Sequence, residues 1–450
     1  MKKLVSGILL TLVLLSLLTL AFGIQRRIVV PDDYPTIQEA VNAAMAGDVI
    51  HVKAGTYYEN VVVDKSVSLV GQDKETTVID GARAQGDPVI YVVASNVTIT
   101  RFKIRNSGKF SGGIWVEESS HVNITDNIVI NNGVGIFFSD SFDNLISENT
   151  ITDNNEGVVL SLRVRGTEVC NNIIIHNGLD GVLISGDNTI LVNNAITTNG
   201  NGIDLDGYNN TIANNTIAVN ECGVLARASN NAIYHNNFVQ NREQTRYPIE
   251  YTPINTWDDD YPAGGNYWSD CIEEDRYKGL NQDQPGSDGI GDKPYIIDEV
   301  NRDRFPLMKP IFAHEYDFAI TVWCPISIIT GTPTTLQVVL CNLGLSTESE
   351  VQLQLLIDGA IVKSEIISEF ASGSTYTFDH FWTPTAEGIY NITACVTPLP
   401  EEYTIIDNVK SVLVNVYTVP IGPAKIHFHP SENEVCLLYT SPSPRDRQKY

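Results

Sequence analysis

The stretch GIFFSDSFDNLISENTITDNNE, Gly135 to Glu156, decides the fold because the sequence on both sides of it repeats its pattern. A glycine opens each unit, at successive steps of 22, 22, 24, 21 and 21 residues. Two asparagines, five positions apart, recur in phase in every unit. A repeat of this length indicates a solenoid in which each unit is one coil. The opening glycines are Gly113, Gly135, Gly157, Gly181, Gly202 and Gly223.

Inside each unit, apolar residues recur at every second position after the glycine. The first and third positions after the glycine, Ile136 and Phe138 in the quoted unit, are apolar throughout. This period of two predicts strands and excludes a helical solenoid. We therefore predict an all-β fold, a right-handed parallel β-helix whose corner asparagines stack and hydrogen-bond from coil to coil. The two asparagine rows are Asn127, Asn149, Asn172, Asn194, Asn215 and Asn236, and Asn132, Asn154, Asn177, Asn199, Asn220 and Asn241.

The two ends of the chain carry different signals. Residues 1–23 have two lysines, an apolar run and the small-residue pattern Ala21-Phe22-Gly23, which predicts a cleaved signal peptide, with an uncleaved anchor as the alternative. Residues 436–450 resemble a translated sequencing adapter, so we interpret them as an artefact that follows a truncated linker at 419–435. A C-terminal anchor would be lost with such a truncation. We expect an extracellular or cell-surface protein, periplasmic in a host with two membranes.

The charge balance limits the class of partner. The chain has 29 basic and 54 acidic side chains and a formal net charge of −25. Such acidity argues against nucleic acid, and a membrane partner is expected only through an anchor. The cysteines outside the suspected artefact form no C-x-x-C pair and no cluster with histidine, which argues against zinc ligation.

The sequence divides into further segments. Thr36 to Glu39 reads as a capping box, so we expect a short helix that covers the N-terminal end of the solenoid. We place this cap and the first irregular coils at 24–112, the regular coils at 113–254, a C-terminal cap at 255–312 and a β-sandwich of alternating strands at 313–418.

Three stretches carry a family resemblance: VPDDYPTIQEAVNAAMAGDVIHVKAGTYYENVVV at 30–63, the asparagine-rich coils, and GGNYWSD with DGIGDKPYIID within 264–298. Together they resemble the NosD-type β-helix, also called carbohydrate-binding and sugar-hydrolase repeats, of the pectin lyase-like superfamily. The segment 317–416, with Asn342-Leu343-Gly344 and Asp407-Asn408, resembles a CARDB domain, an immunoglobulin-like sandwich of prokaryotic surface proteins. Within that sandwich, Cys341 and Cys395 lie on strands that could face each other, which predicts a disulfide.

One outward-facing column is unexpectedly apolar. Its members, two residues after each glycine, are Trp115, Phe137, Val159, Leu183, Asp204 and Leu225. Trp115 and Phe137 on adjacent coils predict a stacking platform for sugar rings, with Asp204 as a further ligand-binding residue. The alternative is that another segment, such as the chain after Asn241, covers this face.

Asp204 and Asp206 form a pair of carboxylates on one strand, which could serve as catalytic acid and base on a glycosidic bond. The motifs that accompany such a pair in polygalacturonases are missing, and no lyase constellation appears in the neighbouring column. We therefore favour an ion pair with Arg227 one coil further on, and membership of the fold alone supplies no activity.

Two kinds of metal site are suggested, one for calcium and one for copper. Asp283, Asp288 and Asp292 surround a glycine turn in a pattern that resembles a calcium loop, although Gln284 to Ser287 interrupts it. The family resemblance implies copper, but the histidines and methionines of this sequence form no cluster of the kind that copper requires, apart from His427 and His429 beside the suspected artefact.

These observations favour a non-enzymatic surface protein that binds polysaccharide or glycan, or mediates adhesion to surface proteins. The alternatives are a carbohydrate-active enzyme, hydrolase or lyase, that uses Asp204 and Asp206, and a copper accessory protein as the NosD resemblance implies.

Overall fold

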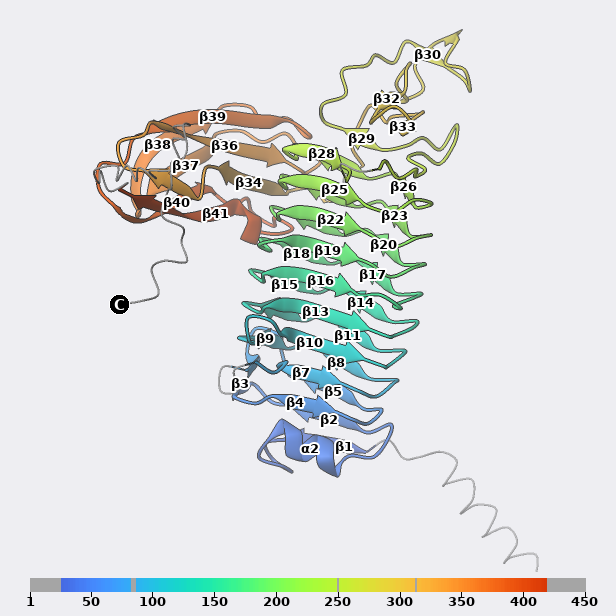
Figure 1. Ribbon diagram of the computed structural model, residues 1–450, viewed down its shortest axis with the longest axis vertical. Coiled ribbons are helices and arrows are strands. Elements are labelled where there is room, and N and C mark those ends of the chain that lie inside the picture. Colours follow the sequence, from blue (N-terminus) through green and yellow to red (C-terminus); the bar gives the residue numbers. More distant parts are fainter. Residues whose placement is uncertain (1–25, 82–85, 249–250, 312–313, 419–450) are drawn as a thin grey trace, which may run out of the picture.

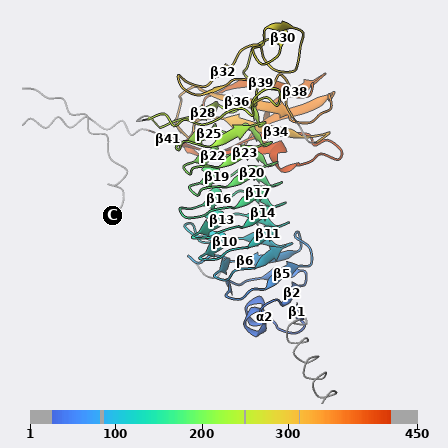
Figure 2. The same cartoon turned by 90° about the vertical axis from the view of Figure 1, so that its right-hand side faces the viewer.

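The computed structural model describes residues 26–81, 86–248, 251–311 and 314–418. In these residues the chain forms a parallel β-helix followed by a β-sandwich, which confirms the predicted all-β fold class (Figures 1 and 2). The predicted signal peptide at 1–23, the linker at 419–435 and the suspected artefact at 436–450 lie outside the described residues. Among the described residues, no helix has the length and apolar character that crossing a membrane requires.

Three parallel sheets run along the β-helix, and we name them the back sheet, the ladder sheet and the docking sheet. The back sheet contains β1 (Arg27–Val30), β2 (Val49–Val52), β5 (Ser68–Gly71), β8 (Thr98–Thr100), β11 (Asn123–Thr125), β14 (Leu145–Ser147), β17 (Glu168–Cys170), β20 (Ile190–Val192), β23 (Thr211–Ala213) and β26 (Ala232–Tyr234). The ladder sheet contains β4 (Val61–Val63), β7 (Ile90–Val92), β10 (Gly112–Glu117), β13 (Val134–Ser139), β16 (Glu156–Leu160), β19 (Asp180–Ile184), β22 (Asn201–Leu205), β25 (Cys222–Ala226) and β28 (Glu243–Arg246). The docking sheet contains β3 (Gly55–Tyr57), β6 (Thr77–Asp80), β9 (Lys103–Arg105), β12 (Ile128–Ile130), β15 (Thr150–Thr152), β18 (Ile173–Ile175), β21 (Ala195–Thr197), β24 (Thr216–Ala218), β27 (Asn237–Val239) and β29 (Tyr267–Trp268).

The core of the β-helix is built from identical positions of successive coils. Ile114, Ile136 and Val158 lie in register on neighbouring strands of the ladder sheet, and all three are fully buried. Burying an apolar side chain of this size contributes about 1.5–3 kcal/mol. Because a coil offers these side chains only to the coils above and below it, the stack is stable only as a whole.

The repeated glycine is required by close approach between coils. A Cβ atom added to Gly157 would lie 2.3 Å from the carbonyl oxygen of Gly181, and one added to Gly135 would lie 2.6 Å from that of Gly157. Real Cβ atoms do not approach a backbone oxygen this closely, so only glycine fits.

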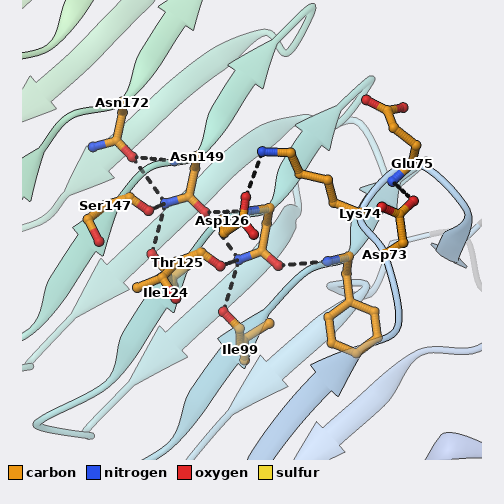
Figure 3. A network of polar contacts seen from close by, with 12 residues as sticks. Asp73, Lys74, Glu75, Ile99, Ile124, Thr125, Asp126, Ser147, Asn149 and Asn172 are labelled. Atoms are coloured by element: carbon orange, nitrogen blue, oxygen red, sulfur yellow. Dashed lines mark hydrogen bonds and ion pairs between the residues drawn. The ribbon is translucent and has the colours of Figure 1, made fainter. Parts of the chain in front are cut away.

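The predicted asparagine stacking is confirmed. The Asn149 side chain donates from Nδ2 to the Ile124 and Ser147 carbonyls and to Asn172 Oδ1, at 2.8–3.0 Å, and Asn172 Oδ1 also accepts from the Asn149 backbone N–H (Figure 3). Every polar atom of the buried amide is therefore used, which is the condition under which burial of a polar group is tolerated. The row ends at Asn266, which accepts from Asn236 at 3.0 Å.

A third asparagine row, not predicted from the sequence, lies at another corner. Asn210, Asn231 and Asn255 are buried, and each backbone N–H donates to the side-chain oxygen of the next asparagine, ending at Asn301. Threonines occupy the equivalent corner in two earlier coils, at Thr167 and Thr189, so the row has no uniform sequence signature.

Both ends of the stack are covered. The predicted N-terminal helix is α2 (Ile37–Ala43), whose cap Thr36 accepts from the Glu39 backbone N–H at 3.1 Å. At the other end, Trp268 stacks between Phe238 and Tyr295, with 4.3 Å between ring centroids on each side. Short strand pairs complete this end: β30 (Tyr277–Lys278) with β31 (Gln284–Pro285), and β32 (Tyr295–Ile296) with β33 (Arg302–Asp303).

The sandwich has a three-stranded and a five-stranded sheet. The first contains β34 (Phe318–Trp323), β36 (Thr334–Asn342) and β39 (Thr375–Trp382), and the second contains β35 (Ser327–Ile329), β41 (Val409–Tyr417), β40 (Gly388–Val396), β37 (Val351–Ile357) and β38 (Ala360–Ile367). The short helix η1 (Ile406–Asn408) precedes β41. Phe318, Leu340, Leu353 and Ile392 are buried between the two sheets.

The sandwich packs against the docking sheet near the C-terminal end of the β-helix (Figure 1). Ala218 and Val219 of the β-helix join one buried cluster with Ala319, Val339 and Cys341 of the sandwich. The contact also includes a buried lysine, Lys410, whose Nζ donates to the Thr198 carbonyl at 3.0 Å. Burial lowers the pKa of this ammonium to about 8.

The predicted disulfide between Cys341 and Cys395 is wrong, because both cysteines are free. Leu340, the neighbour of Cys341, belongs to the sandwich core, while Cys341 itself faces the β-helix. Ala394 and Val396 on either side of Cys395 also belong to the core, so Cys395 points out of the opposite sheet. The two thiols lie on opposite outer faces of the sandwich, and no side-chain rotation can join them.

Candidate binding groove on the ladder sheet

The outward column of the ladder sheet continues past the six predicted positions. In register, Tyr91 lies beside Trp115 and Val62 lies beside Tyr91, while Arg246 follows Leu225 at the other end. The repeat spacing does not reveal Tyr91, because the early coils are irregular in length. Alignment of Ile90-Tyr91-Val92 with Ile114-Trp115-Val116 would have found it.

The aromatic end of the column is a groove of about 570 Å³. The indole of Trp115 stacks on Phe137, with ring centroids 3.8 Å apart and an interplanar angle of 24°. Trp115 lines the groove, whereas Phe137 on the next coil is not among the lining residues, so within the groove one ring of the predicted platform is available, supported by the other. The groove is lined by Asn60, Val61, Val62, Gly86, Asp87, Pro88, Tyr91, Phe110, Ser111, Trp115 and Glu117.

Two of these aromatic residues differ in how they are held. The Tyr91 hydroxyl donates to Glu117 Oε2 at 2.5 Å, and this hydrogen bond raises the pKa of Tyr91. Phe110 comes from a loop outside the repeat and is 89% exposed. No periodic signal could have pointed to it. A fixed tyrosine, a supported tryptophan and an exposed phenylalanine thus surround one groove that carries the carboxylates of Asp87 and Glu117.

The other end of the column is charged. Asp204 is 5% exposed and accepts two hydrogen bonds from Arg227, Nε to Oδ1 at 2.7 Å and Nη2 to Oδ2 at 3.0 Å. Asp206 is exposed beside this pair, and burial together with the Asp204 charge raises its pKa. The ion pair with Arg227 that the sequence favoured is therefore present, and it occupies Asp204.

Two carboxyl groups that the sequence did not single out lie near this pair. Burial raises the pKa of Asp180 to about 6, against a hydrogen bond from Asn201 at 2.8 Å, with Asp204 and Glu156 adding to the rise. Burial and Asp204 also raise the pKa of Glu156. A carboxyl group that is partly protonated near neutral pH beside a fixed ion pair is an arrangement capable of proton transfer.

The segment after Asn241 extends this face in its first described residues. It forms β28, which pairs with β25 at the edge of the ladder sheet and so lengthens the sheet by one strand.

The loop predicted to bind calcium uses its carboxylates locally. Asp292 accepts from the backbone N–H groups of Arg276 and Tyr277, and Asp288 accepts from those of Gly279 and Ile290. Asp283 is exposed. Calcium binding by Asp283, Asp288 and Asp292 stays a prediction.

The residues do not fit a copper centre. In the described ranges, no three His, Cys, Asp or Glu side chains are grouped as metal ligands. The buried His176 has an Nε2 atom without a hydrogen-bond partner among the described residues, but burial and the Lys410 charge lower its pKa to about 3, and no sulfur or imidazole ligand accompanies it. His427 and His429 lie outside the described residues.

Several solved structures resemble parts of the chain in fold. The CARDB domain of the PF1109 protein from Pyrococcus furiosus, solved with di-metal ions, is 24% identical and covers 24% of this chain and 99% of its own, with a TM-score of 0.22. The mannuronan C-5 epimerase AlgE6 A-module from Azotobacter vinelandii is 16% identical over 47% of this chain and 72% of its own, with a TM-score of 0.37. Alginate lyase from Paenibacillus sp. str. FPU-7 is 16% identical over 54% of this chain and 97% of its own, with a TM-score of 0.32.

No curated protein sequence matches the chain. Two family models do. The CARDB model matches residues 315–400, which contain every strand of the sandwich described above except β41. The model of the periplasmic copper-binding protein NosD matches residues 41–272, just over half of the chain and most of the β-helix. The chain therefore belongs to the NosD family and carries a CARDB domain behind its β-helix.

Proposed function

We propose that this protein is an exported surface β-helix that binds a polysaccharide or glycan in the groove on the ladder sheet, with the sandwich as a spacer or adhesion module. The observation that carries the proposal is the convergence of Tyr91, Phe110 and Trp115 on one groove. Soluble proteins seldom leave such a cluster open without a use for it.

The groove suits a sugar chain for physical reasons. The apolar faces of sugar rings pack against aromatic rings, and bordering polar groups accept hydrogen bonds from hydroxyl groups. Trp115 is already held by Phe137, so little rotamer entropy is lost when a ligand binds. Asp87 and Glu117 bring negative charge to the groove, and the whole chain is acidic. A neutral, hydroxyl-rich polysaccharide therefore fits better than a polyuronate.

The test is binding of the full chain to an array of neutral and acidic polysaccharides, followed by affinity measurement on the best ligand. We expect Trp115→Ala and Phe110→Ala each to weaken binding by about tenfold or more, which corresponds to about 1.4 kcal/mol. Phe142→Ala is the matched control, because Phe142 is 45% exposed and lies outside the groove. Equal binding by all three variants would contradict the proposal.

A second candidate function is a carbohydrate-active enzyme that works at the charged end of the ladder sheet. The raised pKa of Asp180, near the ionised pair of Asp204 and Arg227, favours it, because acid and base roles require carboxyl groups with different pKa values. Reducing ends or unsaturated products would accumulate with a suitable polysaccharide and disappear in Asp180→Asn. Binding of the polysaccharide by wild type without any product would rule out the enzymatic function and support the binding function.

A further inference from the structure

The junction between the β-helix and the sandwich contains two buried carboxylates that lie close together. Asp317 precedes β34 and is 5% exposed, and Asp407 lies in η1 and is 1% exposed. The charge of Asp317 acts on the titration of Asp407, and the nearby Glu402 acts on both. Burial, followed by these neighbouring charges, raises the pKa of both aspartates well above the ordinary range.

Three oxygen atoms at this junction have no partner. Asp317 Oδ1, Asp407 Oδ1 and Asn408 Oδ1 are buried and accept no hydrogen bond from any described residue. Asn408 is fully buried, and its Nδ2 donates to Glu402 Oε2 at 2.7 Å, which fixes the direction of its amide. An unpaired buried polar atom costs about 1–3 kcal/mol, so three together require an explanation.

In the described part of the chain, no neighbouring side chain supplies a positive charge to Asp317 or Asp407. Glu402 is occupied by the backbone N–H groups of Phe318 and Leu399. The Lys410 ammonium donates to the Thr198 carbonyl, and the carboxylates that act on the Lys410 pKa are Asp153 and Glu221. Among the described residues, neither Asp317 nor Asp407 forms an ion pair with a lysine or arginine.

We propose that Asp317, Asp407 and Asn408 hold a divalent cation, Ca²⁺ from its preference for oxygen ligands, at the junction of the two modules. A single shared proton would satisfy two of the three oxygen atoms, whereas a cation coordinates all three. The β-helix takes part through Thr197 of β21, whose hydroxyl donates to Asp407 Oδ2 at 3.3 Å. The cation thus fixes η1 and the start of β34 against the docking sheet.

This site differs from the predicted loop at Asp283, Asp288 and Asp292. There the aspartates of the glycine turn, Asp288 and Asp292, accept backbone hydrogen bonds, whereas at the junction Asp317 Oδ1 and Asp407 Oδ1 have no hydrogen-bond partner among the described residues. The site also contains fewer than three acidic side chains free to coordinate, in agreement with the absence of a larger metal-ligand group in the described ranges.

The test is calorimetric titration of the metal-free full chain with Ca²⁺ alone. We expect one site with a dissociation constant of about 10⁻⁴–10⁻³ M, the range of extracellular calcium modules. Asp407→Asn should fold, because its amide can donate to Asp317, but it should bind calcium at least about tenfold more weakly. Asp292→Asn, in the other loop, should bind as the wild type does.

Thr197→Val gives an independent arm, because it leaves all sandwich oxygens in place and removes only the contact from the β-helix. Calcium should raise the melting temperature of wild type. It should also protect the backbone amides of residues 406–417 from hydrogen exchange, and this protection should be weaker in Thr197→Val than in wild type. No calcium heat in wild type would overturn the proposal. So would calcium binding that survives Asp407→Asn and disappears in Asp292→Asn, which would place the cation in the other loop.

Discussion

The β-helix and the sandwich both bury polar side chains, but they satisfy them differently. In the β-helix, Asn172 is satisfied by Asn194, which is the same position one coil later. In the sandwich, Asp317, Asp407 and Asn408 come from unrelated segments and keep unpaired oxygens. Repetition supplies each buried group with an identical partner, whereas a fold without repetition must find its partners case by case. The difference separates what a sequence pattern can predict from what it cannot.

The largest effect is expected when one member of the asparagine row is removed. Asn194→Ala removes the acceptor of the Asn172 backbone N–H, and it removes the side-chain hydrogen bonds that join this position to Asn172, Asn215 and the Val169 carbonyl. We expect a loss of about 3–5 kcal/mol in unfolding free energy, since several buried groups lose hydrogen bonds together. Urea denaturation measures it.

The control for this change is the adjacent Asn193→Ala. Asn193 is exposed with a φ of 56°, so its replacement should cost only about 1 kcal/mol of left-handed backbone strain. Equal losses for the two variants would show that the stacked amides do not stabilise the β-helix as described.

A smaller loss of unfolding free energy is expected when a glycine between two coils is replaced by alanine. Gly157→Ala would put a Cβ atom 2.3 Å from the Gly181 carbonyl oxygen, so the coils must separate, at a cost of about 1–3 kcal/mol. At Gly178 the nearest atom to an added Cβ lies 3.6 Å away, and Gly178→Ala should be nearly neutral. Thermal melts of the two variants decide it, and a neutral Gly157→Ala would disprove the close approach.

The two cysteines sharpen the description of the sandwich. Cys341→Ser buries a hydroxyl in the apolar contact with the β-helix and should cost about 1–2 kcal/mol, whereas Cys395→Ser lies at the half-exposed outer face and should cost less than about 0.5 kcal/mol. A disulfide would make the two losses similar. Thiol labelling of the native protein should modify Cys395 and spare Cys341, because Cys341 is fully buried whereas Cys395 is half-buried.

The smallest effect concerns pH. The Asp180 carboxyl has an ordinary pKa of 3.8 and a folded pKa of about 6, so between these values the folded state holds more protons than the unfolded one. Stability contributed by this group therefore falls as pH rises from about 4 to about 6 and stays low above that. Asp180→Asn should flatten this decline in urea midpoints measured across the window.

Asn201→Ala should do the opposite. It removes the hydrogen bond that lowers the Asp180 pKa and should move the decline to higher pH. If both variants followed the wild-type curve, Asp180 would not be the group that titrates.

The fold could be predicted because each coil repeats the same physical solution. Glycine, apolar and asparagine positions recur, so the inward faces, the stacked amides and the position of Trp115 beside Phe137 followed from spacing alone. The groove was only half predicted, since Phe110 belongs to a loop and Tyr91 to an irregular coil. The packing of the sandwich, through residues such as Val219 and Cys341, has no period at all, and the predicted disulfide failed because alternation within a strand does not reveal which face meets the β-helix.

The in-register asparagines have a consequence for how this protein can vary in length. Each coil ends on the same chemical pattern with which the next begins, so a gene duplication of one unit of 21 residues, such as the step from Gly202 to Gly223, would insert a coil without altering either cap. Loss of one unit would be equally neutral for the ends. Descendants of such a chain could lengthen or shorten the distance between the α2 end and the sandwich in increments of about 4.8 Å, one coil at a time.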